Sequence, residues 1–487
     1  MNWFSHGESR MSRHEHQQSG TWLSSVGRAL PPLGVVLLTL AWVWWSAVPK
    51  PAQLVLITID TTRADRLSLY GFADATMPAL ERLARDGVVF DQAISVAPLT
   101  LPAHTSLFTG LFPPGHGVRD NAGRALDENH TTLAEVLRDR GYCTGAFVSS
   151  VVLDPSRGLA QGFEHYAGVL PGARREATPL QRRADEVVAD AIRWFDGIGT
   201  CPLFLWTHFY DPHRPYEPPE PYRSRYFDPY IGEIMFVDAQ IGRLLDALEQ
   251  RHRLENAIVI VAADHGESLG EHGEEDHGIF VYESVLRVPL IVRLPGSLTT
   301  SGATGDSRVA DLVRLVDVMP TVLDLLRIPA LVTDGVSLTP LLDGSRNALG
   351  LEGYAESMYP RQLGWSSLAA LRDNRFKFIQ APQPELYDLE SDPFERTNII
   401  RDHPAVAQTM SRRLGQAESR DERERTARSD HVDADVRARL AALGYAAGTS
   451  VAPLHAARPA LDPKDCIAGY EQRRRDNTGL SPKGFCQ

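Results

Sequence analysis

Carboxylate and imidazole side chains follow three apolar runs of this sequence. The runs are Leu54–Ile59, Leu203–Thr207 and Ala257–Ala262. The polar residues that come after them are Asp60, His208, Asp211, His213, Asp264 and His265. A single Asp after a strand is commonly a turn or capping residue, but carboxylates and imidazoles gathered in one place are the usual ligands of a divalent metal ion. Their repetition after three runs predicts a metal site.

These side chains come together only if the runs are neighbouring strands of one sheet. Apolar, β-branched runs alternate with helical patterns along the chain, which is typical of parallel βαβ units. We therefore predict an α/β fold with a doubly wound, mostly parallel sheet flanked by helices, in which ligands collect beyond the carboxyl ends of the strands. Further strands are expected at Cys143–Ser149 and Pro289–Leu294, and helices at Met77–Asp86, Thr131 or Thr132 to Arg140, Gln181–Phe195, Ile231–Gln250 and Asp311–Leu326.

The segment Pro98–Gly110 resembles the active-site signature of the sulfatase family, which is part of the alkaline phosphatase superfamily. Pro102 and the closing Thr-Gly pair stand in register with that signature. The Cys or Ser that sulfatases oxidise to formylglycine is Thr100 here, and the usual Arg is His104. Threonine cannot become formylglycine. The resemblance therefore implies a metallohydrolase with Thr100 as its nucleophile, in which His104 could orient that nucleophile or join the metal shell.

Two further segments carry the metal ligands that the resemblance implies. Leu56–Gly71 looks like the sulfatase opening, and Ala262–Glu267 is similar to the second ligand segment of the family. The implied ligands are Asp60, Thr100, Asp264 and His265. This chain has Thr61 where many sulfatases have a second Asp, and His265 where some have Asn. Because an imidazole replaces an oxygen ligand, we expect zinc or manganese, with calcium or magnesium as the alternatives.

Histidines in two other family-like segments imply contacts with the substrate. In His208–Tyr216 and Leu269–Gly278, His213 and His277 match residues that face the ester. An imidazole there could contact the transferring group or protonate the leaving oxygen near neutral pH. If the site holds a second ion, Asp211, His213 and His277 could supply its ligands.

The nucleophile position favours phosphoester hydrolysis over sulfate ester hydrolysis. A sulfatase releases sulfate by elimination from a geminal diol, and this route is closed to a threonyl ester. We expect Thr100 to form a phosphothreonine intermediate with a phosphomonoester or phosphodiester, which water then hydrolyses. The alternatives are a sulfuric ester hydrolase that works without formylglycine, a headgroup phosphotransferase, and a binding module that retains the metal. The substrate is a small-molecule, lipid or glycan ester, selected by loops such as Leu153–Gln181 and Pro215–Pro229.

The composition is that of a globular protein and excludes nucleic acid as the main partner. The chain has 487 residues, of which 43% are hydrophobic, and a formal net charge of -12. Nucleic-acid binding depends on clustered Lys and Arg. The one basic run, Arg473–Arg475, is expected to be a solvated surface cluster. No oligomeric state follows from the sequence.

An uncharged, apolar stretch precedes the first strand. Ala29–Pro49 is long enough to cross a bilayer, which takes about 20 residues. Its three Trp side chains lie towards one end, as at a membrane interface. We expect a retained signal anchor, with a cleaved signal peptide as the alternative. The anchor would tether the catalytic domain outside the cytoplasm, in the periplasm or the extracellular space.

Five segments make up the expected organisation of the chain. They are a cytoplasmic segment at 1–28, a transmembrane anchor at 29–49, the catalytic domain at 50–350, its C-terminal subdomain at 351–400, and a charged helical tail with a linker at 401–487. The subdomain is expected to be a small antiparallel sheet that contains Phe376–Ile379, with Lys377 exposed. In the tail, one short helix is expected at Val436–Leu443.

Other expectations concern single residues. Of the four cysteines, Cys466 and Cys486 could close a loop, and Cys143 is expected to be a buried apolar residue. His272 and Asp276 are expected to be loop residues, and Glu283 and Arg287 to be structural.

Overall fold

The computed structural model describes residues 52–168, 181–296, 298, 307–421, 434–442 and 461–476. The predicted cytoplasmic segment, the predicted anchor and most of the predicted linker lie outside these ranges. Within them, none of the helices combines the length and the apolar composition that crossing a bilayer requires.

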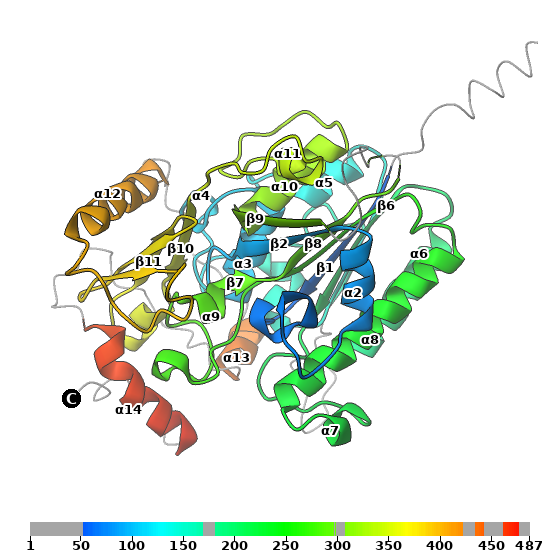
Figure 1. The fold of residues 1–487 in the computed structure, drawn as a ribbon. Helices are drawn as coiled ribbons and strands as arrows, with labels where there is room; N and C mark the ends of the chain where they lie inside the picture. The colour runs from blue at the N-terminus through cyan, green and yellow to red at the C-terminus, as the bar shows by residue number, and fades with distance from the viewer. Residues whose placement is uncertain are drawn as a thin grey trace, which may run out of the picture. The chain divides into compact units, whose positions relative to one another are not determined.

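Nine described strands form a mostly parallel sheet, as predicted (Figure 1). They are β1 (Gln53–Ile59), β2 (Val88–Ile94), β3 (Cys143–Val148), β4 (His165–Ala167), β5 (Leu203–Phe209), β6 (Ala257–Ala263), β7 (Arg287–Val288), β8 (Leu290–Arg293) and β9 (Ser307–Arg314). Their order is β4-β3-β5-β1-β6-β8-β2-β7, with β9 paired to β2. The five strands from β4 to β6 run parallel, and β8 is antiparallel to both of its neighbours.

Helices cover both faces of this sheet. They are α2 (Pro78–Arg85), α3 (Thr100–Thr109), α4 (Pro113–His116), α5 (Leu133–Arg138), α6 (Ala184–Gly197), α7 (Tyr222–Arg225), α8 (Pro229–Gln250), α9 (Glu283–Leu286), α10 (Val318–Leu325) and α11 (Thr339–Leu342). Successive side chains of a strand point to opposite faces, so Leu54 and Leu56 of β1 lie in one core and Val55 and Ile57 in the other. The first core includes α3, α5 and α10, and the second includes α2, α6 and α8 (Figure 1). The predicted doubly wound architecture is confirmed.

One predicted helix is wrong over its first half. The segment Asp311–Leu326 was expected to be helical throughout, but it begins inside strand β9, and α10 starts only at Val318. Leu312, Leu315 and Met319 are all buried, and their spacing imitates the period of an amphipathic helix. The start of the segment becomes a strand because β9 pairs in parallel with β2, a strand that the sequence analysis did not identify.

A second, antiparallel sheet follows in the sequence, as predicted. Its strands, in order, are β10 (Gly353–Ser357), β11 (Leu368–Arg372), β12 (Phe376–Gln380) and β13 (Glu385–Asp388). The last described helices are α12 (Pro404–Asp421), α13 (Ala434–Ala442) and α14 (Pro463–Arg475). Met410 and Leu414 of α12 pack with Leu371 and Phe378 of the sheet. Helix α13 lies where the short tail helix was predicted.

Lys377 on β12 is buried, so its predicted exposure is wrong. Its ammonium group lies 3.1 Å from Glu283 Oε1 and 2.9 Å from Glu395 Oε1. The alternation Phe376-Lys377-Phe378 is typical of a strand with one solvated face, but here both acids cover that face. Glu283 therefore has the structural role expected of it.

Cys143 forms a disulfide with Cys201, so it is not the free buried cysteine that was expected. Strands β3 and β5 are parallel neighbours, with Cys143 opposite Leu203. Cys201 lies just before β5, which brings the two sulfur atoms together at the same edge of the sheet. Cys466 is also disulfide-bonded, and Cys486, with which it was expected to close a loop, lies outside the described residues.

Candidate metal centre and active site

The central strands place two carboxylates side by side at the carboxyl edge of the sheet. Ile59 of β1 lies opposite Ala263 of β6, so Asp60 and Asp264 leave the sheet side by side at its carboxyl edge. His208 on β5 is opposite Thr58 of β1, and its Nε2 lies 3.4 Å from Asp60 Oδ2. The parallel register thus gathers the strand-end side chains as the sequence predicted.

His265 completes this group with an unprotonated nitrogen. Its Nδ1 lies 2.9 Å from the carbonyl oxygen of Gly266, and since a carbonyl can only accept, Nδ1 carries the proton. Nε2 therefore presents a lone pair, 3.6 Å from both Asp60 Oδ1 and Asp264 Oδ2. Burial lowers the pKa of His265 to about 3, which keeps the ring neutral.

The acceptor atoms of this group fit a cation. Asp60 Oδ1 and Asp264 Oδ2 are both buried without a hydrogen-bond partner. Burial raises the pKa of Asp264 well above its usual value, and the neighbouring charge of Asp60 raises it further. Two carboxylates and an imidazole lone pair that face one another repel unless a positive charge lies between them. Asp60, Asp264 and His265 could hold a divalent ion.

Thr100 lies at this cluster because it is the first residue of α3. The preceding Leu99 is extended and the chain turns into the helix at Thr100. The hydroxyl oxygen is fully buried, 3.5 Å from Asp60 Oδ2 and 3.4 Å from His265 Nε2. The structure therefore brings together the four residues that were expected to bind the metal.

His104 supports the first turn of α3 with both ring nitrogens. Nδ1 donates to the backbone carbonyl of Thr100 at 2.8 Å, which leaves Nε2 to accept from the Thr58 hydroxyl at 3.0 Å. Trp206 donates its indole N–H to the same hydroxyl at 3.0 Å. Burial lowers the pKa of His104 to about 3. Although His104 lies near Asp264, these contacts favour the orienting role over a place among the metal ligands.

A second cluster, formed by His213, His277, Glu267 and Asp276, faces His265. The rings of His265 and His277 have centroids 4.4 Å apart, and those of His213 and His277 are 4.9 Å apart. His277 Nδ1 lies 2.9 Å from Glu267 Oε1 and 2.8 Å from Asp276 Oδ1. Asp276, which was expected to be only a loop residue, is thus a direct partner of His277.

Comparisons with known proteins identify the family of this chain. The family model described as "Sulfatase" matches residues 52–328, more than half of the chain, and one described as "N-sulphoglucosamine sulphohydrolase, C-terminal" matches residues 270–420. The chain belongs to the sulfatase family. It is 26% identical over 444 residues to an arylsulfatase of Clostridium perfringens, covering 72% of this chain and 90% of that one. It is also 26% identical to a choline-sulfatase of Rhizobium meliloti, covering 66% and 77%.

Solved structures share the fold of this sulfatase-family chain. A phosphonate monoester hydrolase of Agrobacterium radiobacter superposes with a TM-score of 0.66 at 24% identity, over 76% of this chain and 96% of that one. A putative sulfatase from Bacteroides fragilis superposes with the same TM-score at 22% identity, over 77% and 96%. The architecture is therefore found in proteins named for sulfate chemistry and for phosphonate chemistry.

Asp211 is placed apart from the sulfatase-family site. One carboxylate oxygen accepts the backbone N–H of Ala184, at the start of α6, at 3.2 Å. The same oxygen lies 3.8 Å from the guanidinium of Arg183, which also approaches Glu233 at 3.9 Å. Asp211 is not one of the His, Asp and Glu residues that the described part of the chain groups around a possible ion. Of the three residues considered for a second ion, only His213 and His277 lie together.

Two residues of the site were not among the site residues expected from the sequence. His208 was counted among the potential ligands after the strands but not among the four expected ligands, although its position at a strand end was the same signal that identified Asp60. Glu267, two residues beyond His265, accepts from both His277 and Tyr216, the latter at 3.0 Å. No local pattern distinguishes Glu267 from an ordinary loop acid.

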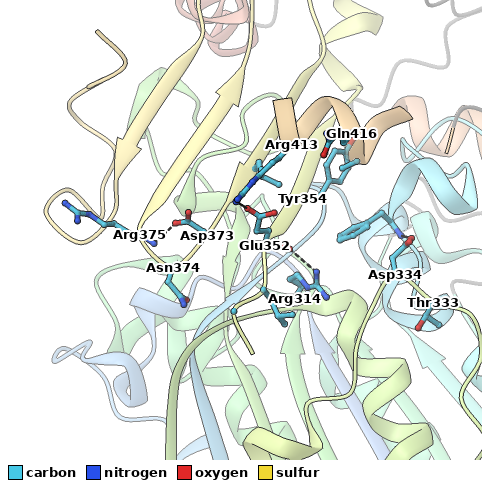
Figure 2. Close-up of a pocket in the computed structure, with 15 residues that line it drawn as sticks. Arg314, Thr333, Asp334, Glu352, Tyr354, Asp373, Asn374, Arg375, Arg413 and Gln416 are labelled. Carbon is cyan, nitrogen blue, oxygen red and sulfur yellow. Dashed lines mark hydrogen bonds and ion pairs between the residues drawn. The ribbon is translucent and has the colours of Figure 1, made fainter. Parts of the chain in front are cut away.

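A cavity of about 1030 Å³ lies elsewhere, beside α12 and the second sheet (Figure 2). None of the predicted site residues lines it. Its arginines are paired within the protein, since Arg413 binds Glu352 and Arg375 binds Asp388. Arg314 is likewise bound to Asp317 at 2.6 Å. We therefore place the chemistry at the strand ends and not in this cavity.

Proposed function

We propose that this sulfatase-family protein is a metal-dependent phosphoester hydrolase with Thr100 as the nucleophile. The observation that supports this most directly is the Thr100 hydroxyl, which is buried within 3.5 Å of two of the expected metal ligands. Threonine has no route to formylglycine, so the chemistry must run through the hydroxyl itself. The shared fold with a phosphonate monoester hydrolase is compatible with chemistry at phosphorus.

Asp60, Asp264, His265 and the Thr100 hydroxyl would hold the divalent ion, for which zinc or manganese is the best match. When bound, the ion lowers the pKa of the hydroxyl and offsets charge on the phosphoryl oxygens. Thr100 loses its hydroxyl proton to solvent, and its Oγ1 forms a bond to phosphorus while the bond to the leaving oxygen breaks. Water hydrolyses the phosphothreonine in a second step and frees the threonine oxygen.

His277 is the better placed of the two candidate proton donors. His213 Nδ1 donates to the backbone carbonyl of Arg214 at 2.6 Å, and burial lowers the pKa of this histidine, so its buried Nε2 carries a lone pair. His277 has two carboxylates at Nδ1, and these stabilise a positively charged ring. In our proposal, His277 gives a proton to the leaving oxygen in the first step and takes one from the attacking water in the second. His213 contacts the ester.

The test is hydrolysis of p-nitrophenyl phosphate, bis-p-nitrophenyl phosphate and p-nitrophenyl sulfate with zinc or manganese added. We expect phosphoester turnover, which Thr100→Ala lowers by at least about 1,000-fold. Thr100→Ser should retain part of the activity, because it keeps the hydroxyl. Thr105→Ala is the matched control, since this buried threonine on the same helix bonds only a backbone carbonyl. Mass spectrometry of acid-quenched enzyme should find phosphate on the Thr100 peptide.

Each alternative function has its own signature in this test. A sulfuric ester hydrolase, as in the arylsulfatase and choline-sulfatase relatives, would turn over the sulfate ester preferentially. Sulfate turnover that survives Thr100→Ala would overturn the nucleophile assignment. A headgroup phosphotransferase would give more phosphorylated alcohol than phosphate when an alcohol acceptor is added. A bound ion without turnover of any ester would indicate a binding module.

We also propose that the catalytic domain works outside the cytoplasm, tethered by residues 29–49, on a small-molecule, lipid or glycan ester. The disulfide between Cys143 and Cys201 supports an oxidising compartment. In a Gram-negative host, the full chain should sediment with membranes and be cleaved by protease added to spheroplasts. Protection from that protease, or a soluble full chain, would contradict the tether.

A further inference from the structure

We infer that the C-terminal helix α14 is part of the active-site architecture, and that Arg474 positions the proton donor His277 by holding Asp276. This inference rests on the function proposed above. Arg474 was expected to be a solvated surface residue, but its side chain is only 28% exposed and its Nη2 lies 2.6 Å from Asp276 Oδ2. The other oxygen of the same carboxylate contacts His277 Nδ1. Asp276 therefore bridges the helix and the histidine.

Asp276 needs this cation because it shares its partner with Glu267. Both carboxylates lie within 3 Å of the single Nδ1 atom of His277, and two negative charges so close together repel. Glu267 is held on its far side by the Tyr216 hydroxyl. Asp276 is held by Arg474. Without the guanidinium, we expect Asp276 to turn away and the ring of His277 to lose its fixed orientation.

Both carboxylate oxygens of Asp276 have partners, and this bears on whether the cluster binds a metal or transfers a proton. A carboxylate that already binds an imidazole N–H and a guanidinium has no oxygen directed at a second ion. The cluster of His213, Asp276 and His277 is therefore better suited to hold and deliver a proton than to bind a metal. This is the arrangement in which a buried acid fixes the tautomer of a catalytic histidine.

Helix α14 is docked firmly enough to hold this contact. Cys466, Ile467 and Tyr470 are buried in the core that lies above one face of the large sheet. The start of the helix is fixed by Lys464, which binds Glu385 at 2.5 Å. Its second half lies beside the loop that carries His277, where Glu471 accepts the backbone N–H of Glu275 at 3.2 Å.

The helix lies beyond the segments that the family matches cover. Those matches end at residues 328 and 420, whereas α14 begins at Pro463. The contact joins residues 198 positions apart in the sequence. Arg474 therefore lies outside the matched segments, whereas the other residues of the site lie within them.

The test compares Arg474→Met with Arg475→Met on two esters that differ in their leaving group. Phenyl phosphate needs a proton on its leaving oxygen far more than p-nitrophenyl phosphate does. We expect Arg474→Met to lower kcat for phenyl phosphate by about 10- to 100-fold, and kcat for p-nitrophenyl phosphate only a few-fold, with KM and bound metal unchanged. Arg475, on the same helix as Arg474, binds Glu275 of the loop and is half exposed, so Arg475→Met should leave both rates unchanged.

Two further variants protect this test against a simple folding defect. Asp276→Asn should reproduce the leaving-group pattern of Arg474→Met, and the double variant should be no worse than either single one. Arg474→Lys should recover part of the loss. An equal loss on both esters, or a match between Arg474→Met and Arg475→Met, would overturn the inference. Activity that survives Thr100→Ala would instead overturn the proposed function, so the two failures are distinguishable.

Discussion

Two groups of buried charge in this protein look alike in composition but differ in how they are balanced. At the strand ends, Asp60 and Asp264 lie with imidazoles, and among the described residues no Lys or Arg pairs with them. Beside the second sheet, Glu283 and Glu395 flank Lys377. Arg372 also approaches Glu283, at 3.2 Å. Both groups are removed from water, but only the second contains its own cations.

The difference separates a structural cluster from a binding site. Buried carboxylates are stable only when a positive charge or several hydrogen bonds compensate their lost hydration. The Lys377 group meets this requirement within the chain. The group around Asp60 and Asp264 does not, and its two unpartnered oxygens are the atoms that the proposed ion would compensate. Removing the compensating cation should therefore harm the Lys377 group permanently and the group around Asp60 and Asp264 reversibly.

The largest effect is expected from Lys377→Met. This change leaves Glu283 and Glu395 buried without their ammonium partner, and breaking a buried pair in this way costs about 3–5 kcal/mol. The free energy of unfolding, measured by urea denaturation at neutral pH, should fall by that amount. Metal affinity should not change. Lys464→Met is the control, because Lys464 is partly exposed where it binds Glu385, and its loss should cost about 1 kcal/mol or less. Equal losses in the two variants would contradict the comparison.

The cluster of Asp60, Asp264 and His265 was easier to predict than the Lys377 group because of where its members lie in the sequence. A parallel sheet places all its strand ends at one edge, so Asp60, Asp264 and His265 follow from recognising the strands. Lys377 depends on Glu283, 94 positions away, and the strand pattern alone gives no indication that this face is covered.

The same reason explains the other differences between expectation and structure. The pairing of β9 with β2 and the contact of Arg474 with Asp276 both join remote segments. Periodicity and charge pattern describe a segment and not its neighbours, so periodicity assigned a helix to part of β9 and the basic run assigned a solvated surface to Arg474. The role of His104 required knowing that Thr58 and the Thr100 carbonyl occupy its two nitrogens.

The second largest effect is expected from the ion itself. Removing it with a chelator leaves the carboxylates of Asp60 and Asp264 uncompensated and should lower the stability of the wild-type protein. When the free ion had been present at about 100 times its Kd, the loss is about 2.7 kcal/mol. Zinc or manganese should restore the unfolding midpoint. The same shift should appear in Lys377→Met, since the two groups are independent. An unfolding midpoint that changes with neither the chelator nor the added ion would refute the metal centre.

A smaller effect of opposite sign is expected from Asp264→Asn in chelator-treated protein. The amide removes a buried negative charge whose oxygen has no hydrogen-bond partner, so the variant should be more stable than the metal-free wild type by about 1–2 kcal/mol. With the ion added, the order should reverse, because the variant has lost a ligand. Thus removing the charge of Asp264 stabilises the metal-free protein, whereas removing the charge of Lys377 destabilises it. A destabilised metal-free variant would show that Asp264 is compensated by the chain.

The smallest effect tests an intermediate case, the pair formed by Asp211 and Glu233. Burial raises the pKa of Asp211 to about 7 and that of Glu233 to about 8, and Arg183 opposes both shifts only weakly, from 3.8 and 3.9 Å. A carboxyl group whose pKa is raised by folding does not lower the stability of the protein below its unfolded pKa, near pH 4, because it is protonated in both states. As the pH rises from there towards the folded pKa, the protein loses stability. Asp211→Asn removes that penalty and keeps an oxygen for Ala184. In chelator-treated protein, its stability advantage should be absent at pH 4, grow as the pH rises to about 7 and then remain constant. An advantage that does not depend on pH would show that Arg183 compensates this pair as Lys377 compensates its own acids.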